Sequence, residues 1–290
     1  MASSRCVRAG TTEVRRRAFA LGATLASVGL GASWLGLDSG ASGAPRSGPA
    51  ALRAGVLGGV EEEVLRFVAA QNPSLYLSIE RFAHAGELRR ALLAGNLELG
   101  SFENALELES APENSQHELV SAGAAVTLPL GFYSRRLRQL SSLGPGSRVL
   151  LSEEPNEQGR ALLVLYHYGL LGFAEELGPF ARLKDVTSNK RQLELVPLPG
   201  DALPGRLDGD DLVALSYQQA AHLGLAPARN ALALEDGFSP FAQVLTVRRE
   251  TKTQHSTGPA WLEQLLAAYR APVVKDFILR RFEDSVRRAW

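Results

Sequence analysis

The hydrophobic positions of the chain follow two periods, which alternate from about residue 51 to the last residue, 290. Short apolar runs bounded by Gly, Pro or polar residues predict strands at 52–57, 75–79, 97–102, 148–152, 193–197, 212–215 and 241–247. Apolar residues three or four positions apart predict helices at 60–68, 87–94, 159–168, 217–223, 261–269 and 273–282. Residues 124–133 are apolar and extended, with a break at Pro129. Alternating strands and helices predict an α/β fold with mostly parallel sheets flanked by helices.

The first 41 residues have the pattern of an export signal. Five arginines, at positions 5, 8, 15, 16 and 17, precede a stretch at 18–37 without any charge, and small residues follow to Ala41 and Ala44. Arg16 and Arg17 precede Ala18-Phe19, which favours the twin-arginine route over the general secretory route. We expect cleavage near Ala41, then a linker at 42–50 and a soluble, periplasmic chain. Retention of 18–37 as a membrane anchor is the alternative, because twenty uncharged residues can just span a bilayer.

The composition excludes several classes of protein and several kinds of structural or metal site. The 31 basic and 31 acidic residues balance, whereas a nucleic-acid binder usually has a basic excess. A hydrophobic content of 45% with 21% charged residues is typical of a globular protein rather than a disordered one. The single cysteine, Cys6, excludes a disulfide within the chain and a cysteine-based metal site. It also precedes the apolar stretch, whereas a lipid anchor needs a cysteine just after one, so we expect no lipid anchor.

The usual catalytic signatures are missing from the sequence. It has neither the Gly-x-Ser-x-Gly motif of serine hydrolases nor a phosphate-binding Gly-x-x-x-x-Gly-Lys loop. The five histidines have no metal-ligand spacing, so the sequence predicts no metal, no cofactor and no catalytic residue. The acidic runs at 61–63 and 208–211 are expected to be solvated faces or turns.

One stretch, at 152–160, combines features of an anion site. A predicted strand ends there, a Pro-containing turn follows, and a helix begins after Asn156, which is a good helix N-cap. The free N–H groups and dipole of a helix start attract anions, and Arg160 adds a planar bidentate cation, which suits a carboxylate ligand. The alternative is that Arg160 pairs with Glu153, Glu154 or Glu157 and only stabilises the turn.

Several segments, in order and correctly spaced, resemble the methionine-binding lipoprotein family, the solute-binding subunits of methionine ABC importers. The family's Pro-Asn-Asp-Pro-Thr-Asn-x-Gly-Arg stretch corresponds to residues 152–160, and its Gly-Leu-Tyr-Ser segment corresponds to Gly131–Ser134. A Gly-Leu-Ile, a Ser-Pro-Tyr and a terminal Trp have counterparts at 169–171, 239–241 and Trp290. The resemblance runs from about residue 52 to residue 290.

The resemblance implies a two-lobed periplasmic-binding-protein fold of type II. Lobe 1 would comprise 51–129 and 241–290, lobe 2 would comprise 130–240, and the ligand would bind in the cleft between them. It implies a role in transport without catalysis and without a cofactor, in which a monomer delivers an amino acid or related carboxylate-bearing solute to an ABC permease and ATPase. A degenerate paralogue that acts as a sensory or structural partner is the alternative.

The same resemblance implies the residues of the ligand site. Arg160 would hold the ligand carboxylate, and Glu157, Phe82, Phe102, Asn104 and Ser216 would line the pocket. Four positions differ from the family: Ala85 replaces a Tyr, Asn104 a His, and Glu157 and Ser216 each replace an Asn. Loss of these polar partners would cost about 1–3 kcal/mol each for methionine, so we expect a ligand other than free methionine.

Overall fold

The computed structural model describes residues 51–174, 178–253 and 259–290. The expected export signal and linker lie outside these ranges. Within them, no helix combines the length and the apolar character that crossing a bilayer requires.

The first sheet has five strands in the order β2-β1-β3-β13-β4. They are β1 (Leu52–Val56), β2 (Leu77–Arg81), β3 (Leu99–Asn104), β4 (Leu119–Ala124) and β13 (Gln243–Arg248). Strand β1 pairs in parallel with β2 and β3, whereas β13 runs antiparallel to β3 and β4. Strand β13 therefore lies between strands that precede it by more than a hundred residues.

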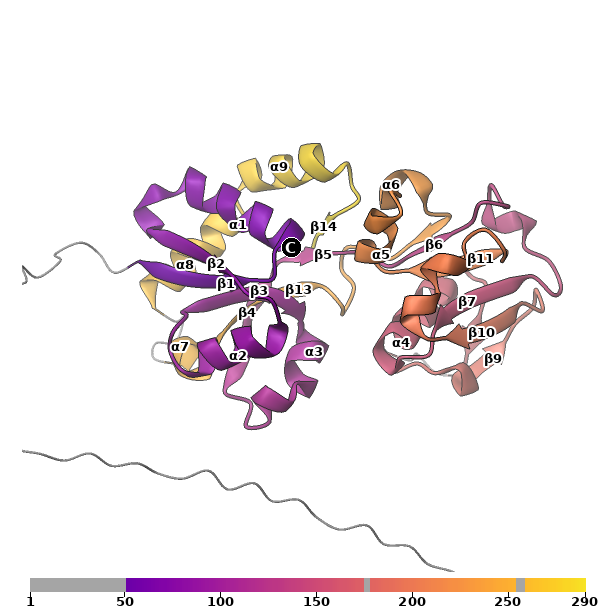
Figure 1. The fold of residues 1–290 in the computed structure, drawn as a ribbon, viewed down its shortest axis with the longest axis horizontal. Coiled ribbons are helices and arrows are strands. Elements are labelled where there is room, and N and C mark those ends of the chain that lie inside the picture. The colour runs from indigo at the N-terminus through magenta and orange to yellow at the C-terminus, as the bar shows by residue number, and fades with distance from the viewer. Residues whose placement is uncertain (1–50, 175–177, 254–258) are drawn as a thin grey trace, which may run out of the picture. The chain divides into compact units, whose positions relative to one another are not determined.

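Helices cover both faces of the first sheet (Figure 1). They are α1 (Gly59–Gln71), α2 (Ala85–Leu93), α3 (Ala105–Ser110), α7 (Arg249–Thr253), α8 (Ala260–Tyr269) and α9 (Pro272–Phe282). Helices α1, α8 and α9 share one core with β1, β3 and β13, and α2 and α3 share a second core with β3 and β4. On α1, Val64, Leu65 and Val68 are fully buried, and each such side chain stabilises the fold by about 1.5–3 kcal/mol.

The second sheet also has five strands, in the order β10-β7-β11-β6-β12. They are β6 (Gly131–Tyr133), β7 (Arg148–Ser152), β10 (Glu194–Leu198), β11 (Leu212–Leu215) and β12 (Ala233–Leu234). Strands β10, β7 and β11 are parallel, and β6 is antiparallel to both β11 and β12. Helix α4 (Pro155–His167) packs in the core on one face, α5 (Tyr217–His222) packs on the other, and α6 (Pro227–Asn230) is a single turn.

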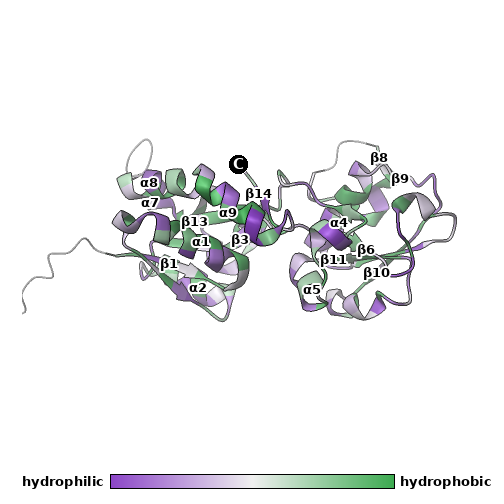
Figure 2. Ribbon diagram, turned by 90° about the horizontal axis from the view of Figure 1, so that it is seen from above, coloured by the Kyte–Doolittle hydropathy of each residue, from purple (hydrophilic) through white to green (hydrophobic). Residues whose placement is uncertain are grey.

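Short elements complete the described chain. Strand β5 (Val126–Thr127) pairs with β14 (Arg287–Arg288), and β8 (Gly172–Phe173) pairs with β9 (Val186–Ser188). The 3₁₀ turns are Pro73–Leu75, Pro112–Asn114, Leu140–Ser142, Leu183–Asp185, Gly200–Ala202 and Pro204–Arg206. Figure 2 shows hydrophobic residues along strands such as β13 and β11, and a mixture of hydrophobic and hydrophilic residues on the helices.

The predicted α/β class and strand directions are confirmed, because in each sheet four strands run one way and one runs against them. Several short elements were not predicted, among them β4 and α3. Strand β4 is rich in small residues and is held at the sheet edge by β13, and α3 has only six residues. The division into lobes at 129–130 and 240–241 stays a prediction.

Two predictions from local pattern were wrong. Helix α4 starts at Pro155 with Glu154 as its N-cap, so Asn156 is not the cap. Proline suits this first position because its fixed φ matches the helix and the missing N–H would have had no partner there.

The acidic runs are not wholly solvated either. Glu61, Glu62 and Asp210 are buried. Glu62 accepts hydrogen bonds from Arg66 and Arg81, and Asp210 pairs with Arg148 and Arg206. Arg81 and Arg148, which are distant in sequence, help to compensate for burial of Glu62 and Asp210, and the acidic runs themselves do not reveal these partners.

Candidate functional site

The carboxyl ends of the parallel strands lead into helices in both sheets. Strand β1 leads to α1, β3 to α3, β7 to α4 and β11 to α5. The turn between β1 and α1 uses Gly58 and Gly59 at φ of 108° and 65°, which side chains other than glycine adopt at a cost. Ligands of open α/β sheets bind at such strand ends, so these turns form the candidate site.

Phe82, Ala85 and Phe102 lie together at the strand ends of the first sheet. All three pack in one hydrophobic cluster with Leu88 and Leu92 of α2. Phe102 is 7% exposed, while Phe82 is half-buried and follows β2 directly. The structure thus brings the two predicted aromatic residues together, with Phe82 the more accessible of the two.

Asn104 and Ser216 cap the helices that start at these turns. The Asn104 Oδ1 accepts a hydrogen bond from the Glu107 N–H at 3.0 Å, and the Glu107 carboxylate accepts one from the Asn104 N–H at 3.1 Å. Ser216 and Gln219 form the same reciprocal pair at the start of α5. Both are capping boxes, whose sequence signal is an Asn or Ser followed three residues later by Glu or Gln.

Arg160 lies in the second turn of α4 and points to a carboxylate that the sequence did not suggest. Its Nε and Nη2 donate to Glu235 Oε2 at 2.7 and 2.5 Å, and Nη2 also donates to the Leu128 carbonyl. The guanidinium carbon lies 5.5 Å from the centre of the Phe241 ring. None of Glu153, Glu154 and Glu157 pairs with it in the described part of the chain.

The Arg160 side chain is 12% exposed and Glu235 is 5% exposed, so the pair is nearly buried. Glu235 also accepts from the Leu130 N–H and the Ser239 hydroxyl. Arg160 lines a cavity of about 190 Å³ between α4 and residues 235–241. Its Nη1 has no hydrogen-bond or ion-pair partner among the described residues.

Glu157, one turn before Arg160, sits in an acidic environment. Burial raises its pKa, the Arg160 charge opposes that rise, and the Glu107 and Glu154 carboxylates add to it. Glu107 belongs to α3, on the first sheet.

Tyr217 of α5, on the second sheet, packs against the core of the first sheet. Burial raises the pKa of Tyr217, the first residue of α5, and the Glu63 and Glu61 carboxylates of α1 raise it further against the opposing charge of Arg281. Burial also raises the pKa of Glu61 to about 7. Glu61 has no ion-pair partner within the ranges that the structure describes. Glu61, Glu107 and Glu235 are the site residues that local sequence pattern missed.

Solved structures with this arrangement define the class of the protein as a periplasmic substrate-binding protein. An ABC-transporter periplasmic substrate-binding protein from Coxiella burnetii matches with a TM-score of 0.66 and 28% identity, over 82% of this chain and all of that one. A nutrient binding protein from Burkholderia cenocepacia, bound to methionine, matches with a TM-score of 0.65 and 28% identity over the same shares.

Sequence comparison gives the family. The model of the NlpA lipoprotein family matches residues 52–290, and the chain belongs to this family. The D-methionine-binding lipoprotein MetQ of Yersinia pestis is 28% identical over 253 residues, which is 86% of this chain and 92% of that protein. Lipoprotein 28 of Escherichia coli K12 is 27% identical over 244 residues, or 82% and 88%. The resemblance and the fold that it implied are confirmed.

Proposed function

We propose that the chain is an exported solute-binding protein that delivers a small amino-acid-like solute to an ABC permease and its ATPase. The observation that carries this proposal is that candidate residues lie at helix starts on the strand ends of both sheets, Asn104 on the first and Glu157, Arg160 and Ser216 on the second. A ligand there would contact both sheets and hold them together. Hinge closure driven by tighter binding to the closed state follows from this arrangement. No bond is made or broken, and the chain acts as a monomer.

The ligand carries both a carboxylate and a cationic group. The Arg160 guanidinium holds the carboxylate, and Glu157 pairs with the ammonium. Phe82 and Phe102 contribute an apolar side to the pocket. The methionine in the Burkholderia structure and the relatives named D-methionine-binding support the general class of ligand.

Mass spectrometry of small molecules that co-purify with the protein is the direct test. Candidates are then added back, and a ligand at 100 times its Kd should stabilise the protein by about 2.7 kcal/mol. Failure of every amino acid and related carboxylate to stabilise it would contradict the proposal and favour a partner without a transported ligand.

Free methionine should bind weakly. Ala85, Asn104, Glu157 and Ser216 stand where the family has other polar groups, and both Asn104 and Ser216 already use their side chains as helix caps. Calorimetric titration of the ligand-free protein with L- and D-methionine measures this. A nanomolar Kd for either would show that the pocket tolerates all four changes.

A further inference from the structure

A cavity of about 460 Å³ opens beside the end of β6, and its charged lining is entirely basic. Arg135 and Arg138 come from the loop after β6, and Arg229 comes from α6. The other lining residues are polar or apolar, and none carries a carboxylate: Tyr133, Ser134, Leu137, Leu207, Leu225, Asn230 and Leu232. A volume in this range is typical of small-molecule sites.

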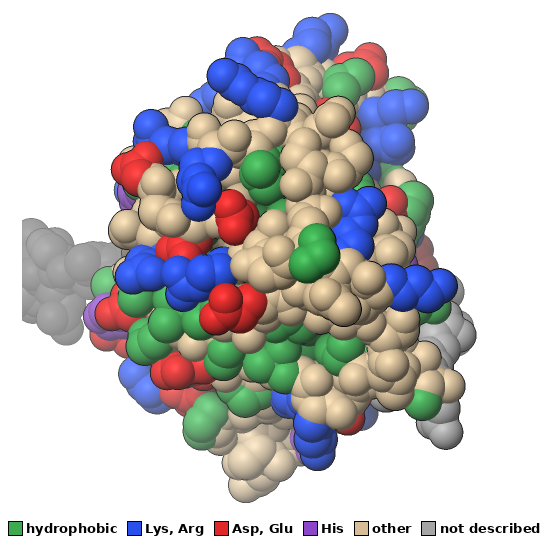
Figure 3. Space-filling model, turned by 90° about the vertical axis from the view of Figure 1, so that its right-hand side faces the viewer, with side chains coloured by type: hydrophobic (Ala, Val, Ile, Leu, Met, Phe, Trp, Pro, Cys, Tyr) green, Lys and Arg blue, Asp and Glu red, His purple; other side chains and the backbone are tan. Residues whose placement is uncertain are grey.

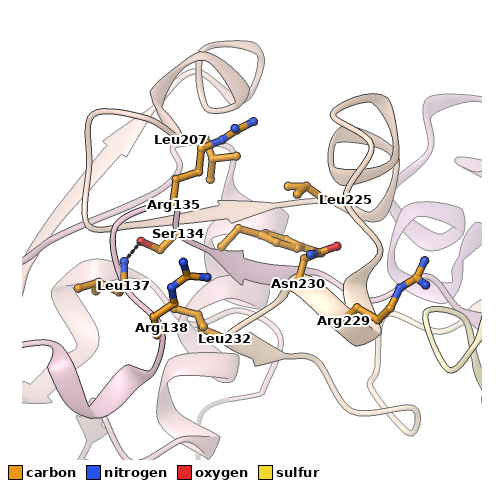
Figure 4. A pocket seen from close by; sticks show the side chains of 10 residues that line it. Ser134, Arg135, Leu137, Arg138, Leu207, Leu225, Arg229, Asn230 and Leu232 are labelled. Carbon is orange, nitrogen blue, oxygen red and sulfur yellow. Dashed lines mark hydrogen bonds between the residues drawn. The ribbon is translucent and has the colours of Figure 1, made fainter.

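The loop after β6 contains three arginines, Arg135, Arg136 and Arg138, and only Arg135 and Arg138 line the cavity. The Ser134 hydroxyl accepts hydrogen bonds from the N–H groups of Arg136 and Leu137, which fixes the turn. Arg136 pairs with Asp211 at 3.1 Å and does not line the cavity. Arg138 has no ion-pair or hydrogen-bond partner in the described part of the chain. Figure 4 shows its guanidinium between Leu137 and Leu232, directed toward the middle of the cavity.

The two other arginines have partners that an anion can displace. Arg135 pairs with Asp208 at 3.0 Å, where the side chains are 58% and 80% exposed. Arg229 pairs with Glu283 at 3.2 Å, where they are 68% and 58% exposed. Exposed pairs of this kind contribute about 0–1 kcal/mol, so exchange for a stronger anion costs little.

Asn230 adds a neutral donor to the same cavity. Its Oδ1 accepts a hydrogen bond from the Ala226 N–H at 2.7 Å, which directs the amide NH₂ elsewhere. That NH₂ has no partner among the residues described. The cavity therefore offers guanidinium and amide donors beside apolar side chains, an arrangement that favours a small anion.

This cavity is separate from the candidate solute site. Tyr133 at the cavity pairs with Val213, whereas the solute-site end of β11, at Leu215, pairs with Gly131. The two sites thus lie at opposite ends of β6. Figure 3 shows acidic and basic side chains interspersed on the face at the right-hand side of Figure 1, so that face as a whole is not basic.

We propose that this cavity binds a small polyanion with two or more phosphate or carboxylate groups. Arg138 would bind it together with Arg135 and Arg229, whose present partners Asp208 and Glu283 the anion displaces. Pyrophosphate and citrate are suitable calorimetric probes, because they present the two anion chemistries separately. Binding of either supports the proposal, and the difference between them identifies the preferred group.

Three variants of the purified protein test the geometry. Arg138→Gln should weaken binding about tenfold or more, since charge-assisted hydrogen bonds are lost. Arg136→Gln is the matched control, from the same loop but outside the cavity, and should leave binding nearly unchanged. Glu283→Gln should strengthen binding because it frees Arg229.

Equal losses in Arg136→Gln and Arg138→Gln would indicate general surface attraction and overturn the proposal. A Kd weaker than about 1 mM for both probes would also overturn it, as would binding of an acidic peptide alone. Melting temperatures of all three variants confirm that folding is unchanged.

Discussion

At the scale of single residues, buried charge has two arrangements in this protein. Asp210 and Glu62 each accept from two arginines, and Glu235 holds Arg160, whereas Glu61 is buried without an ion-pair partner in the described ranges. Removal of one partner from a buried pair is costly because the other charge stays desolvated. The pairs therefore support the fold, and the unpaired carboxylate costs stability.

Arg160→Ala should reduce both stability and ligand affinity. Stability falls by about 3–5 kcal/mol because Glu235 stays buried without its cation. Affinity falls because the ligand carboxylate loses the guanidinium. Arg160→Lys keeps the charge but loses the bidentate fork, and should weaken binding less.

Glu235→Gln separates the two roles of Arg160. It removes the ion pair without changing the shape of the side chain, so stability should fall while affinity for the solute is kept or increased. Melting temperature and calorimetry on both variants make the comparison. Unchanged affinity in Arg160→Ala would exclude Arg160 from the ligand site.

Asp210→Asn should destabilise the protein by about 3–5 kcal/mol, because Arg148 and Arg206 both depend on its buried carboxylate. Asp208→Asn is the control from the same acidic run, since Asp208 is 80% exposed and forms only a surface pair. Urea unfolding of the two variants measures the difference. Similar small effects in both would contradict the importance of the buried pair.

At the scale of elements, several candidate site residues lie at the starts of helices. The capping boxes of α3 and α5 occupy Asn104 and Ser216, and the start of α1 holds Glu61. Burial raises the pKa of Glu61 to about 7, from an unfolded value of 4.5. The folded protein therefore binds an extra proton between these pH values.

Stability should consequently fall as pH rises from 4.5 to about 7 on account of Glu61, because the folded state must then give up a proton that it holds more tightly. Glu61→Gln should remove this dependence and stabilise the protein at pH 8 by about 1–3 kcal/mol. Glu63→Gln is the control, because Glu63 forms an exposed pair with Arg281. Thermal unfolding at pH 5 and pH 8 tests both, and an identical pH profile for Glu61→Gln and the unmodified protein would contradict the prediction.

At the scale of the whole molecule, two five-stranded sheets are each completed by a strand from later in the chain. Strand β13 enters the first sheet between β3 and β4, and β12 joins the second sheet through β6. Residues 235–241 connect these two strands and include Glu235, the partner of Arg160. The arginine of α4 is thereby tied to a segment that links the sheets.

Export should remove residues 1–41, which precede the described chain. Sequencing of the mature N-terminus from the periplasmic fraction should find Ser42 first. Replacement of Arg16 and Arg17 by Lys should block export if the twin-arginine route is used, whereas normal export would indicate the general route. An intact Met1 or an acylated Cys6 in that fraction would contradict the prediction.

The sequence by itself determined the order of most elements, the α/β class and the family. Strands β7 and β11 match their predicted ranges, because buried apolar runs and their polar borders are local signals. It also predicted Arg160, in the helix that follows a strand and a turn, as a ligand-binding residue, and that role stays a proposal.

Only the tertiary structure decided which charges meet. Glu235 lies 75 residues from Arg160, and Arg81 lies 19 residues from Glu62. Strand β4 likewise depends on β13 for its pairing, and the basic cavity unites a loop after β6 with α6. Local pattern fixes which face of an element is apolar, whereas ion pairs, edge strands and cavities depend on distances between segments that only folding brings together.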